Sequence, residues 1–422
     1  LKFTQEDIDY LRTTGAFNEK FLNYLANFKL HCNIWAIEEG MPIFPQEPIV
    51  TVEGPAIECQ LLETLLLVTF NHQCLIATKA NRIVRSAAGR PVMEFGARRA
   101  QGYDAAYFGA RASYIGGCGS TSCVMAARDF GIPASGTMAH SWVQMFPTEY
   151  DAFKKYAELY PDACVLLVDT YNVLRHGVPD AIKVFDEVLK PMGKRPKGIR
   201  IDSGDIAYLS KKARKMLDEA GFPDAVISAS SDLDEYLINS LKDQGAAITS
   251  WGVGTNLITA KDNAAFGGVY KMAAIQKEDG NFVPKIKISE NSEKITNPGN
   301  KTIYRIYDKA TGKIRADLIC LADETFDEAC DMNLFDPNEP WKKTRIAGGT
   351  YTLRELLVPV FENGKCVYDS PKVMDIQAAC TKEKDTIWDE TKRFVNPSRI
   401  YVDLSDKLYR LKHDLLNDMS ES

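Results

Sequence analysis

The fold is decided by four segments that read VLLVDT (165–170), GIRIDSGD (198–205), AVISASSD (225–232) and ITSWGVGT (248–255). Each begins with a short apolar run that predicts a buried strand, and each continues into polar or glycine residues. The segments start 23 to 33 residues apart, and amphipathic patterns such as 181–189 and 207–220 fill the intervals. This spacing is typical of parallel strands that are joined by crossover helices.

In a βα barrel the carboxyl ends of the strands share one face, so polar residues that are distant in sequence meet there. A doubly wound open sheet is the alternative, and it would place ligands at a switch point. We expect an α/β fold in which residues 76–284 form an irregular βα barrel of mostly parallel strands. Residues 1–75 and 285–422 are expected to form a second, discontinuous α+β domain.

Other patterns predict the elements of this second domain. Helical periodicity marks 1–28, where Thr4 can cap the first turn, and also 55–85. Alternating segments predict antiparallel strands within 28–53 and a hairpin formed by 302–306 and 316–320. The chain is expected to end in helices near 375–394 and 406–417.

Composition excludes several classes of protein. The 422 residues are 45% hydrophobic and 26% charged, as in globular domains, and the net charge is −6. An acidic chain is unsuited to nucleic acid or anionic membranes as main partners. Residues 61–70, the longest apolar run, are too short for a membrane span. Ten cysteines without a CxxC pair predict reduced thiols and a cytoplasmic protein.

A second informative stretch, residues 94–146, reads EFGARRAQGYDAAYFGARASYIGGCGSTSCVMAARDFGIPASGTMAHSWVQMF. Its middle is crowded with glycines and hydroxyl residues, which allow close backbone approach and suit anions. Residues 131–135 predict a short buried strand that leads toward His140, a position suited to chemistry. The phosphate loop GxxxxGK[ST] does not occur in the chain.

The polar residues after the strands favour a site that binds an anionic ligand. Arg98 and Arg200 can bind phosphate or carboxylate through paired N–H groups. The backbone of GVGT (252–255) can donate to a phosphate. Asp202 and Asp205 can bind Mg²⁺ or ribose hydroxyls, and we expect Asp205 as a Mg²⁺ ligand. Such groups would stabilise negative charge on a bound ligand.

The combined motifs EFGARRAQ (94–101), ASYIGG (112–117) and GIPASGTMAHSWV (131–143) resemble the nicotinate phosphoribosyltransferases, and the resemblance continues through most of the chain. It implies that nicotinate mononucleotide is formed from nicotinate and 5-phosphoribosyl 1-diphosphate, the first step of NAD salvage from nicotinate. In this ligase-class enzyme ATP is a co-substrate that phosphorylates a histidine, here His140.

The resemblance also implies roles for individual residues. Asp169 would orient the imidazole of His140, and Asp202 would complete the catalytic set. Arg200 would face the nicotinate carboxylate, with Thr137 beside it. The remaining positions are expected to bind the phosphoribosyl diphosphate: Arg98, Ser230, Ser231, Gly252, Gly254, Thr255, Lys271 and Lys294.

Ser122 bears on the choice between nicotinate and nicotinamide. The related nicotinamide enzymes place an aspartate at the corresponding position, which accepts a bond from an amide and repels a carboxylate. A serine hydroxyl can instead donate to a carboxylate, so Ser122 predicts use of the acid.

The resemblance further implies a homodimer whose active site lies near the interface. In the family an earlier segment with a TDLY-like motif supplies a tyrosine that stacks on the nicotinate of the neighbouring subunit. That segment is not among the 422 residues.

Three other functions compete with this prediction. The nearest is a nicotinamide phosphoribosyltransferase, which Ser122 disfavours. Another is a barrel lyase that forms a Schiff base through Lys271, which borohydride trapping with a carbonyl substrate would reveal. The third is a binding or scaffold protein without activity, which the presence of His140, Asp169, Arg200 and Asp202 disfavours.

Overall fold

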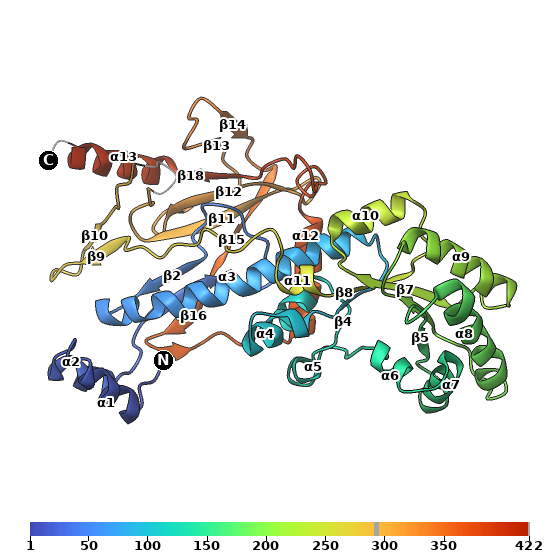
Figure 1. Ribbon diagram of the computed structural model, residues 1–422. Helices are drawn as coiled ribbons and strands as arrows, with labels where there is room; N and C mark the ends of the chain where they lie inside the picture. The colour runs from blue at the N-terminus through green and yellow to red at the C-terminus, as the bar shows by residue number, and fades with distance from the viewer. Residues whose placement is uncertain (291–294, 421–422) are drawn as a thin grey trace. The chain divides into compact units, whose positions relative to one another are not determined.

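The computed structural model describes residues 1–290 and 295–420 (Figure 1). The chain forms two compact units. Unit 1 contains residues 1–68, 268–370 and 382–422, and unit 2 contains residues 69–267 and 371–381. The first boundary falls inside the long helix α3 (Ala56–Ser86), which contributes to both units.

Unit 2 is built on six parallel strands in the order β4-β3-β8-β7-β6-β5. Their bounds are β3 (Val92–Glu94), β4 (Ser120–Thr121), β5 (Val165–Leu167), β6 (Gly198–Ile201), β7 (Val226–Ser231) and β8 (Ser250–Val253). The expected strand at 131–135 is reduced to a single parallel bridge between Ala134 and Thr121. Among the residues described, no ladder joins β5 back to β4, so hydrogen bonds between strands do not close this sheet into a ring. The predicted α/β class and parallel sheet are confirmed.

Helices connect these strands and cover the sheet (Figure 1). They are α4 (Tyr103–Gly116), α5 (Val124–Phe130), α6 (His140–Gln144), α7 (Glu149–Leu159), α8 (Val178–Val184), α9 (Ile206–Glu219), α10 (Glu235–Asp243) and α11 (Thr255–Ile258). Short turns of helix lie at η1 (Ala97–Arg99), η2 (Val173–Gly177) and η3 (Phe185–Leu189). Side chains of β5 to β8 such as Leu166, Ile199 and Ile227 are fully buried against them, as expected for a parallel sheet covered by helices.

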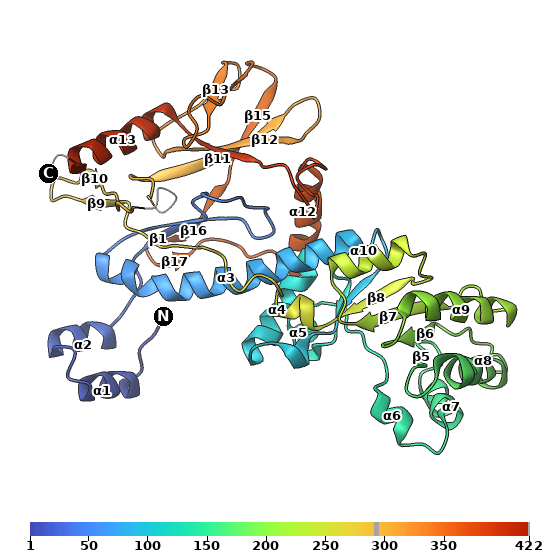
Figure 2. The same ribbon diagram turned by 45° about the horizontal axis from the view of Figure 1, so that its top comes forward.

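Unit 1 contains two four-stranded sheets, β17-β16-β1-β2 and β15-β11-β12-β18 (Figure 2). The strands are β1 (Asn33–Ile37), β2 (Val50–Glu53), β11 (Lys301–Asp308), β12 (Ile314–Leu321), β15 (Tyr351–Glu355), β16 (Leu357–Glu362), β17 (Lys365–Cys366) and β18 (Tyr401–Leu404). Two small hairpins add β9 (Ala274–Gln276) with β10 (Phe282–Pro284), and β13 (Met332–Phe335) with β14 (Lys343–Ile346). The predicted antiparallel pairs β1–β2 and β11–β12 are confirmed.

The helices near the two ends of the chain follow the sequence signals closely at their starts. Thr4 caps α1 (Gln5–Thr13) in a capping box with Asp7, and α2 (Glu19–Ala26) follows. Helix α13 (Asp406–Ser420) starts at the predicted residue. Helix α12 (Val373–Asp385) ends nine residues before the predicted end at Phe394, and turns follow it.

The units differ from the predicted domains at three places, the smallest being residues 69–75 of α3, which belong to unit 2. Residues from 268 onward belong to unit 1, where the Tyr270 hydroxyl donates to the Cys59 carbonyl at 2.9 Å. Residues 371–381 belong to unit 2 because Val373 and Ile376 pack against Ile115. Contacts distant in sequence, which composition does not reveal, therefore set the latter two boundaries.

Helix α3 is long and apolar enough, by length and composition, to cross a membrane. Residues 61–70, the apolar run noted in the sequence, are only part of this helix. Leu75, Ile76 and Ile83 of the helix are buried in the core of unit 2, whereas only 17% of its apolar 18-residue window is buried. A single helix of this kind is weak evidence for a membrane span.

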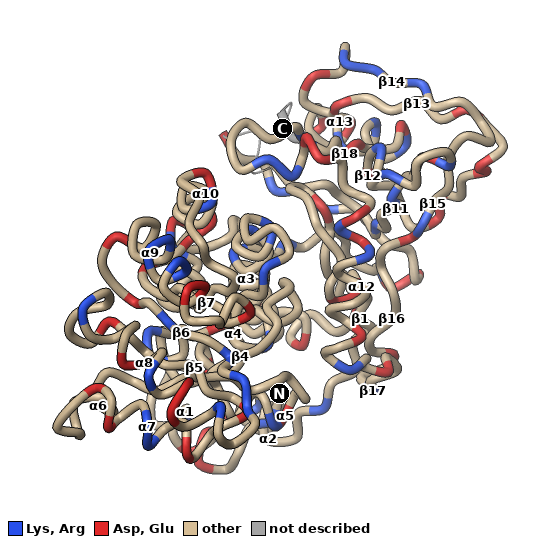
Figure 3. Tube along the Cα trace, turned by 90° about the vertical axis from the view of Figure 1, so that its right-hand side faces the viewer, with Lys and Arg blue, Asp and Glu red and all other residues tan. Residues whose placement is uncertain are grey.

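Acidic and basic residues are interspersed along unit 2 (Figure 3). Many form local pairs on helices, such as Arg214 with Asp218 at 2.7 Å and Lys190 with Asp186 at 3.2 Å. Exposed pairs of this type contribute little to stability, so the core carries most of it.

Candidate functional site

Arg200 is the centre of a hydrogen-bonded cluster at the carboxyl ends of the unit 2 strands. Its Nε donates to Ser230 Oγ at 2.6 Å, Nη1 donates to Thr137 Oγ1 at 2.7 Å, and Nη2 donates to Asp202 Oδ1 at 2.7 Å. Ser230 lies on β7, Thr137 precedes α6, and Asp202 directly follows β6. The structure thus brings together residues up to 63 positions apart that the sequence selected.

Asp202 is bound from two sides. Burial alone would raise its pKa, but bonds from the Ser230 hydroxyl and the Arg200 guanidinium lower the pKa below its usual value on balance. The carboxylate therefore stays ionised throughout the neutral range. A fixed negative charge of this kind suits a position beside a developing cation.

His140 is the first residue of α6 and faces the same cluster. Its Nε2 lies 3.6 Å from Asp202 Oδ2, and its Nδ1 lies 3.1 Å from Thr170 Oγ1. The side chain is 41% exposed, so one face of the imidazole is open to a ligand. His140 and Arg200 therefore share Asp202 as a common neighbour.

Asp169 is predicted to orient His140, but in the structure its hydrogen bonds go to other residues. Asp169 Oδ2 accepts from the Asp202 backbone N–H at 2.9 Å and from the Ser203 hydroxyl at 2.7 Å. Because β5 and β6 are parallel neighbours, the carboxylate at the end of β5 reaches the end of β6. The next residue, Thr170, contacts the imidazole instead. Asp169 thus braces the loop that carries Asp202.

Glu149 is a buried carboxyl group near Asp169 that the sequence analysis did not select. It is the first residue of α7 and is 5% exposed, and neither side-chain oxygen has a hydrogen-bond partner. Burial, followed by the charges of Asp180 and Asp169, raises the pKa of Glu149 to about 7. In the sequence it looks like an ordinary acidic residue at a helix start, so no local signal marks it.

This raised pKa predicts a pH-dependent effect of Glu149→Gln. The unfolded carboxyl ionises near its usual pKa, whereas the folded carboxyl keeps its proton until about pH 7. Wild-type stability should therefore fall as pH rises between these values. Glutamine cannot ionise, so the stability of the variant relative to the wild type should be greater at pH 8 than at pH 5. Each kcal/mol of stability gained in this way should raise the thermal midpoint by about 2–4 °C. Thermal melts at both pH values measure this, and a pH-independent difference would contradict it.

Phe95 is a further residue that the sequence analysis missed, although it lies within the quoted EFGARR motif. It follows β3, and its ring centroid is 5.8 Å from the guanidinium carbon of Arg200. A Cβ at Gly252 would lie 2.6 Å from the Phe95 ring. The glycine therefore has a second role beside the predicted backbone contact, because it leaves room for this aromatic face. An aromatic residue directly after a strand end was the available signal.

The other predicted residues of unit 2 surround the strand ends. Arg98 in η1 and Ser122 after β4 are both exposed, and the Ser122 N–H donates to the Glu94 carbonyl at 2.9 Å. Ser231 is the exposed last residue of β7. Gly254 and Thr255 join β8 to α11 and are half-buried. All lie at or beyond the carboxyl ends of the strands of this sheet.

Three further predictions concern Asp205, Lys271 and Lys294. The Asp205 side chain caps α9 by accepting from the Tyr208 N–H at 2.9 Å. Lys271 belongs to unit 1, is exposed, and donates to the Tyr270 carbonyl at 2.8 Å. Lys294 lies outside the described residues. Within residues 1–290 and 295–420, no group of three or more His, Cys, Asp or Glu side chains is placed to hold a metal ion.

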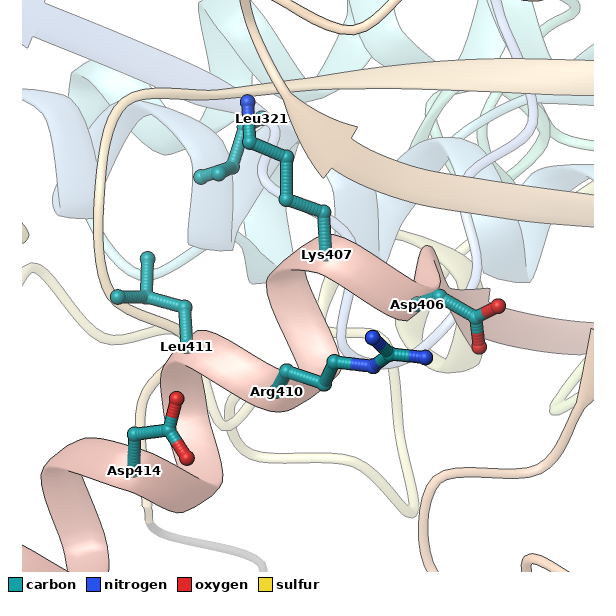
Figure 4. A pocket seen from close by; sticks show the side chains of 6 residues that line it. All are labelled: Leu321, Asp406, Lys407, Arg410, Leu411 and Asp414. Atoms are coloured by element: carbon teal, nitrogen blue, oxygen red, sulfur yellow. The ribbon is translucent and has the colours of Figure 1, made fainter.

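A separate hollow of about 450 Å³ lies on α13 in unit 1 (Figure 4). Leu321 and Leu411 form its apolar part, and Asp406, Lys407, Arg410 and Asp414 lie around it. Lys407 is paired with Asp323 at 2.6 Å. The hollow contains none of the residues that converge on Arg200, so it is not a candidate for the same chemistry.

Comparisons with known proteins identify the family of the chain. Models of the nicotinate phosphoribosyltransferase family match residues 91–313, and models of its N-terminal and C-terminal domains match residues 1–71 and 300–412. A nicotinate phosphoribosyltransferase of Bacillus subtilis is 46% identical over 99% of this chain and 84% of its own length. One from Mycobacterium tuberculosis is 41% identical over 89% of this chain and 73% of its own length.

Solved structures give the same result. The crystal structure of human nicotinic acid phosphoribosyltransferase superposes with a TM-score of 0.86 at 25% identity, covering 98% of this chain and 89% of that one. A nicotinate-nucleotide pyrophosphorylase from Pyrococcus furiosus superposes with a TM-score of 0.64 at 25% identity, covering 87% and 84%. The chain belongs to the nicotinate phosphoribosyltransferase family.

Proposed function

We propose that this chain joins nicotinate to the ribosyl carbon of 5-phosphoribosyl 1-diphosphate, with release of diphosphate. The observation that carries the proposal is the cluster in which Arg200 binds Thr137, Ser230 and Asp202 beside His140. A guanidinium with a planar aromatic neighbour, Phe95, is suited to a flat ring that bears a carboxylate. The product, nicotinate mononucleotide, would enter NAD synthesis.

In the proposed mechanism the pyridine nitrogen attacks the ribosyl carbon as the bond to diphosphate breaks. Asp202 provides negative charge beside the carbon as it becomes positive. Arg98, Ser230, Ser231 and the backbone of Gly252, Gly254 and Thr255 would bind phosphate groups. Lys271 and Lys294 are proposed to contact the diphosphate as well.

We further propose that ATP phosphorylates His140. The imidazole nitrogen attacks the γ-phosphorus, ADP leaves, and water later hydrolyses the phosphohistidine to orthophosphate. Thr170 and Asp202 would hold the ring in position, and Asp169 would act indirectly through the loop of Asp202. The coupling draws product formation forward at the expense of ATP hydrolysis.

Mg²⁺ is proposed to be bound together with the diphosphate, because this ion commonly combines one or two carboxylates with substrate phosphates and water. One oxygen of Asp205 caps α9, and the other is available at an exposed position, so the donor set fits such an arrangement. The proposal also includes a cytoplasmic homodimer with the active site near the interface, and neither nucleic acid nor membrane as partner.

The direct test is to incubate the purified chain with nicotinate, 5-phosphoribosyl 1-diphosphate, Mg²⁺ and ATP. Nicotinate mononucleotide and diphosphate should appear, and ADP release should require the other substrates for sustained turnover. Product from nicotinamide at an equal or higher rate would favour the nicotinamide enzyme instead. Absence of any product would overturn the proposal.

Ser122→Asp should change the preference for the acid. An aspartate at this exposed loop position would repel the nicotinate carboxylate, so kcat/KM for nicotinate should fall by about 100-fold, the cost of an unfavourable charge pair. Ser122→Asn is the matched control, because asparagine has nearly the same shape as aspartate but carries no charge. Steady-state kinetics with nicotinate and nicotinamide measure the preference. An unchanged ratio in Ser122→Asp would rule out this role for Ser122.

A further inference from the structure

Glu94, the last residue of β3, is a fully buried carboxyl group between two loops of the proposed site. Burying a carboxylate is unfavourable unless hydrogen bonds or a cation replace its water. Among the residues described, no cation pairs with Glu94, and its partners are hydrogen-bond donors from two different loops. Packing alone therefore does not explain why a carboxyl group is buried at this position.

The first partner is the backbone N–H of Gly96, which donates to Glu94 Oε1. Gly96 immediately precedes η1, the turn that presents Arg98. A Cβ on Gly96 would lie 2.7 Å from the Gly254 carbonyl oxygen, so this turn packs directly on the loop after β8. Glu94 thus fixes where the turn with Arg98 begins.

The second partner is the Thr121 hydroxyl, which donates to Glu94 Oε2 at 2.6 Å. The same hydroxyl accepts from the Cys123 N–H at 3.0 Å, and the intervening Ser122 N–H donates to the Glu94 carbonyl at 2.9 Å. The residues on both sides of Ser122, and Ser122 itself, are therefore held through Glu94 and Thr121. The Ser122 side chain is left exposed.

Thr121 also connects this loop to the segment that leads to His140. Its N–H donates to the Pro133 carbonyl at 3.0 Å, and its carbonyl accepts from the Ser135 N–H at 3.0 Å. Residues 133–135 are followed by Thr137, which binds Arg200. One carboxylate thus lies at the junction of three segments that carry proposed substrate contacts.

We propose that Glu94 is a positioning residue that sets the acid-over-amide preference by holding Ser122 and the Arg98 turn in fixed relation. The inference rests on the proposed function and adds to it the group that orients the acid-recognising loop. Glu94 acts through Ser122 and Arg98, and it does not touch substrate itself. Both of its oxygens must accept a bond, which glutamate does and glutamine cannot.

The test compares four variants. Glu94→Gln keeps the shape but replaces one acceptor oxygen by a donor, and Thr121→Val removes the hydroxyl that links Glu94 to Cys123. Thr121→Ser restores that hydroxyl. Thr249→Val is the matched control, because the Thr249 hydroxyl accepts from the Ile227 N–H at 3.0 Å. Thr249 directly precedes β8 and so lies at the amino end of its strand, whereas Glu94 lies at the carboxyl end of β3.

We expect Glu94→Gln and Thr121→Val to raise KM for nicotinate by about 10- to 100-fold, the change that follows loss of a hydrogen bond to a charged group. The ratio of kcat/KM for nicotinamide to kcat/KM for nicotinate should rise in the same two variants. Thr121→Ser should restore the wild-type ratio. Thr249→Val should lower only the thermal midpoint, because a purely structural loss does not alter the preference.

An unchanged ratio in folded Thr121→Val, or an equal shift in Thr249→Val, would overturn the inference. The two Thr121 variants decide the question if Glu94→Gln does not fold. Wild-type activity is measured first, and its absence would overturn the proposed function and the inference together. Wild-type activity with an unaltered ratio in the variants would overturn the inference alone.

Discussion

His140→Asn is expected to abolish phosphorylation of the protein by ATP. Asparagine retains a polar group near Thr170 but has no nitrogen nucleophile, so it cannot accept the phosphoryl group. With γ-³²P-labelled ATP, the wild type should carry acid-labile label on the peptide that contains residue 140, and the variant should carry none. The increase in nicotinate mononucleotide that ATP produces should also disappear.

His176→Asn provides the matched control, since His176 is an exposed histidine of the same unit. This variant should be labelled like the wild type. Label that persists in His140→Asn, or label mapped to another residue of the wild type, would contradict the phosphohistidine proposal. Formation of product without ATP would remain compatible with the transferase chemistry, so the two parts of the mechanism are separable.

Arg200→Gln should cause the largest loss of nicotinate use. The substitution removes the guanidinium that binds Ser230, Thr137 and Asp202, and it leaves the partly buried Asp202 without its cation. Loss of these charge-assisted bonds should lower kcat/KM for nicotinate by about 100-fold or more, since removing one member of a hydrogen-bonded charge pair costs about 3 kcal/mol. Steady-state kinetics with each substrate varied in turn measure the loss.

Arg200→Lys tests whether charge alone suffices. Lysine has a single ammonium group and cannot reach three partners with the planar geometry of a guanidinium, so it should restore only a small part of the activity. Arg195→Lys is the control, because the Arg195 pair with Asp224 is exposed at the surface of the same unit. Full activity in Arg200→Lys would show that geometry at this position is unimportant.

The strand spacing predicted the parallel sheet, because buried apolar segments of fixed length leave a strong periodic pattern. It also predicted that Asp202 and Ser230 lie near Arg200, since the carboxyl ends of parallel strands must meet, whereas Thr137 was expected there only from the family resemblance. Phe95 and Glu94 were overlooked because their importance depends on Gly252 and Thr121, which come close only after folding. The same holds for Thr170, which contacts His140 in place of the expected Asp169.

Glu149 could not be selected from sequence at all. Its raised pKa arises from burial and from Asp180 and Asp169, which lie 31 and 20 positions away in the chain. Nor could the sequence assign residues 371–381 to unit 2, because α12 is separated from its partners Tyr114 and Ile115 by more than 250 residues. Tertiary contacts between remote segments determine both features, and a single sequence does not encode them locally.

The assignment of α12 has a consequence for synthesis of the protein on the ribosome. The side chain of Gln377 donates to the carbonyls of Tyr114 and Cys118, at the C-terminal end of α4. The unit that carries His140 and Arg200 therefore remains incomplete until almost the whole chain has emerged. A nascent chain that stalls before residue 371 would expose Tyr114 and Ile115 to solvent and to chaperones. Production of a finished catalytic unit is thus coupled to translation of the C-terminal region.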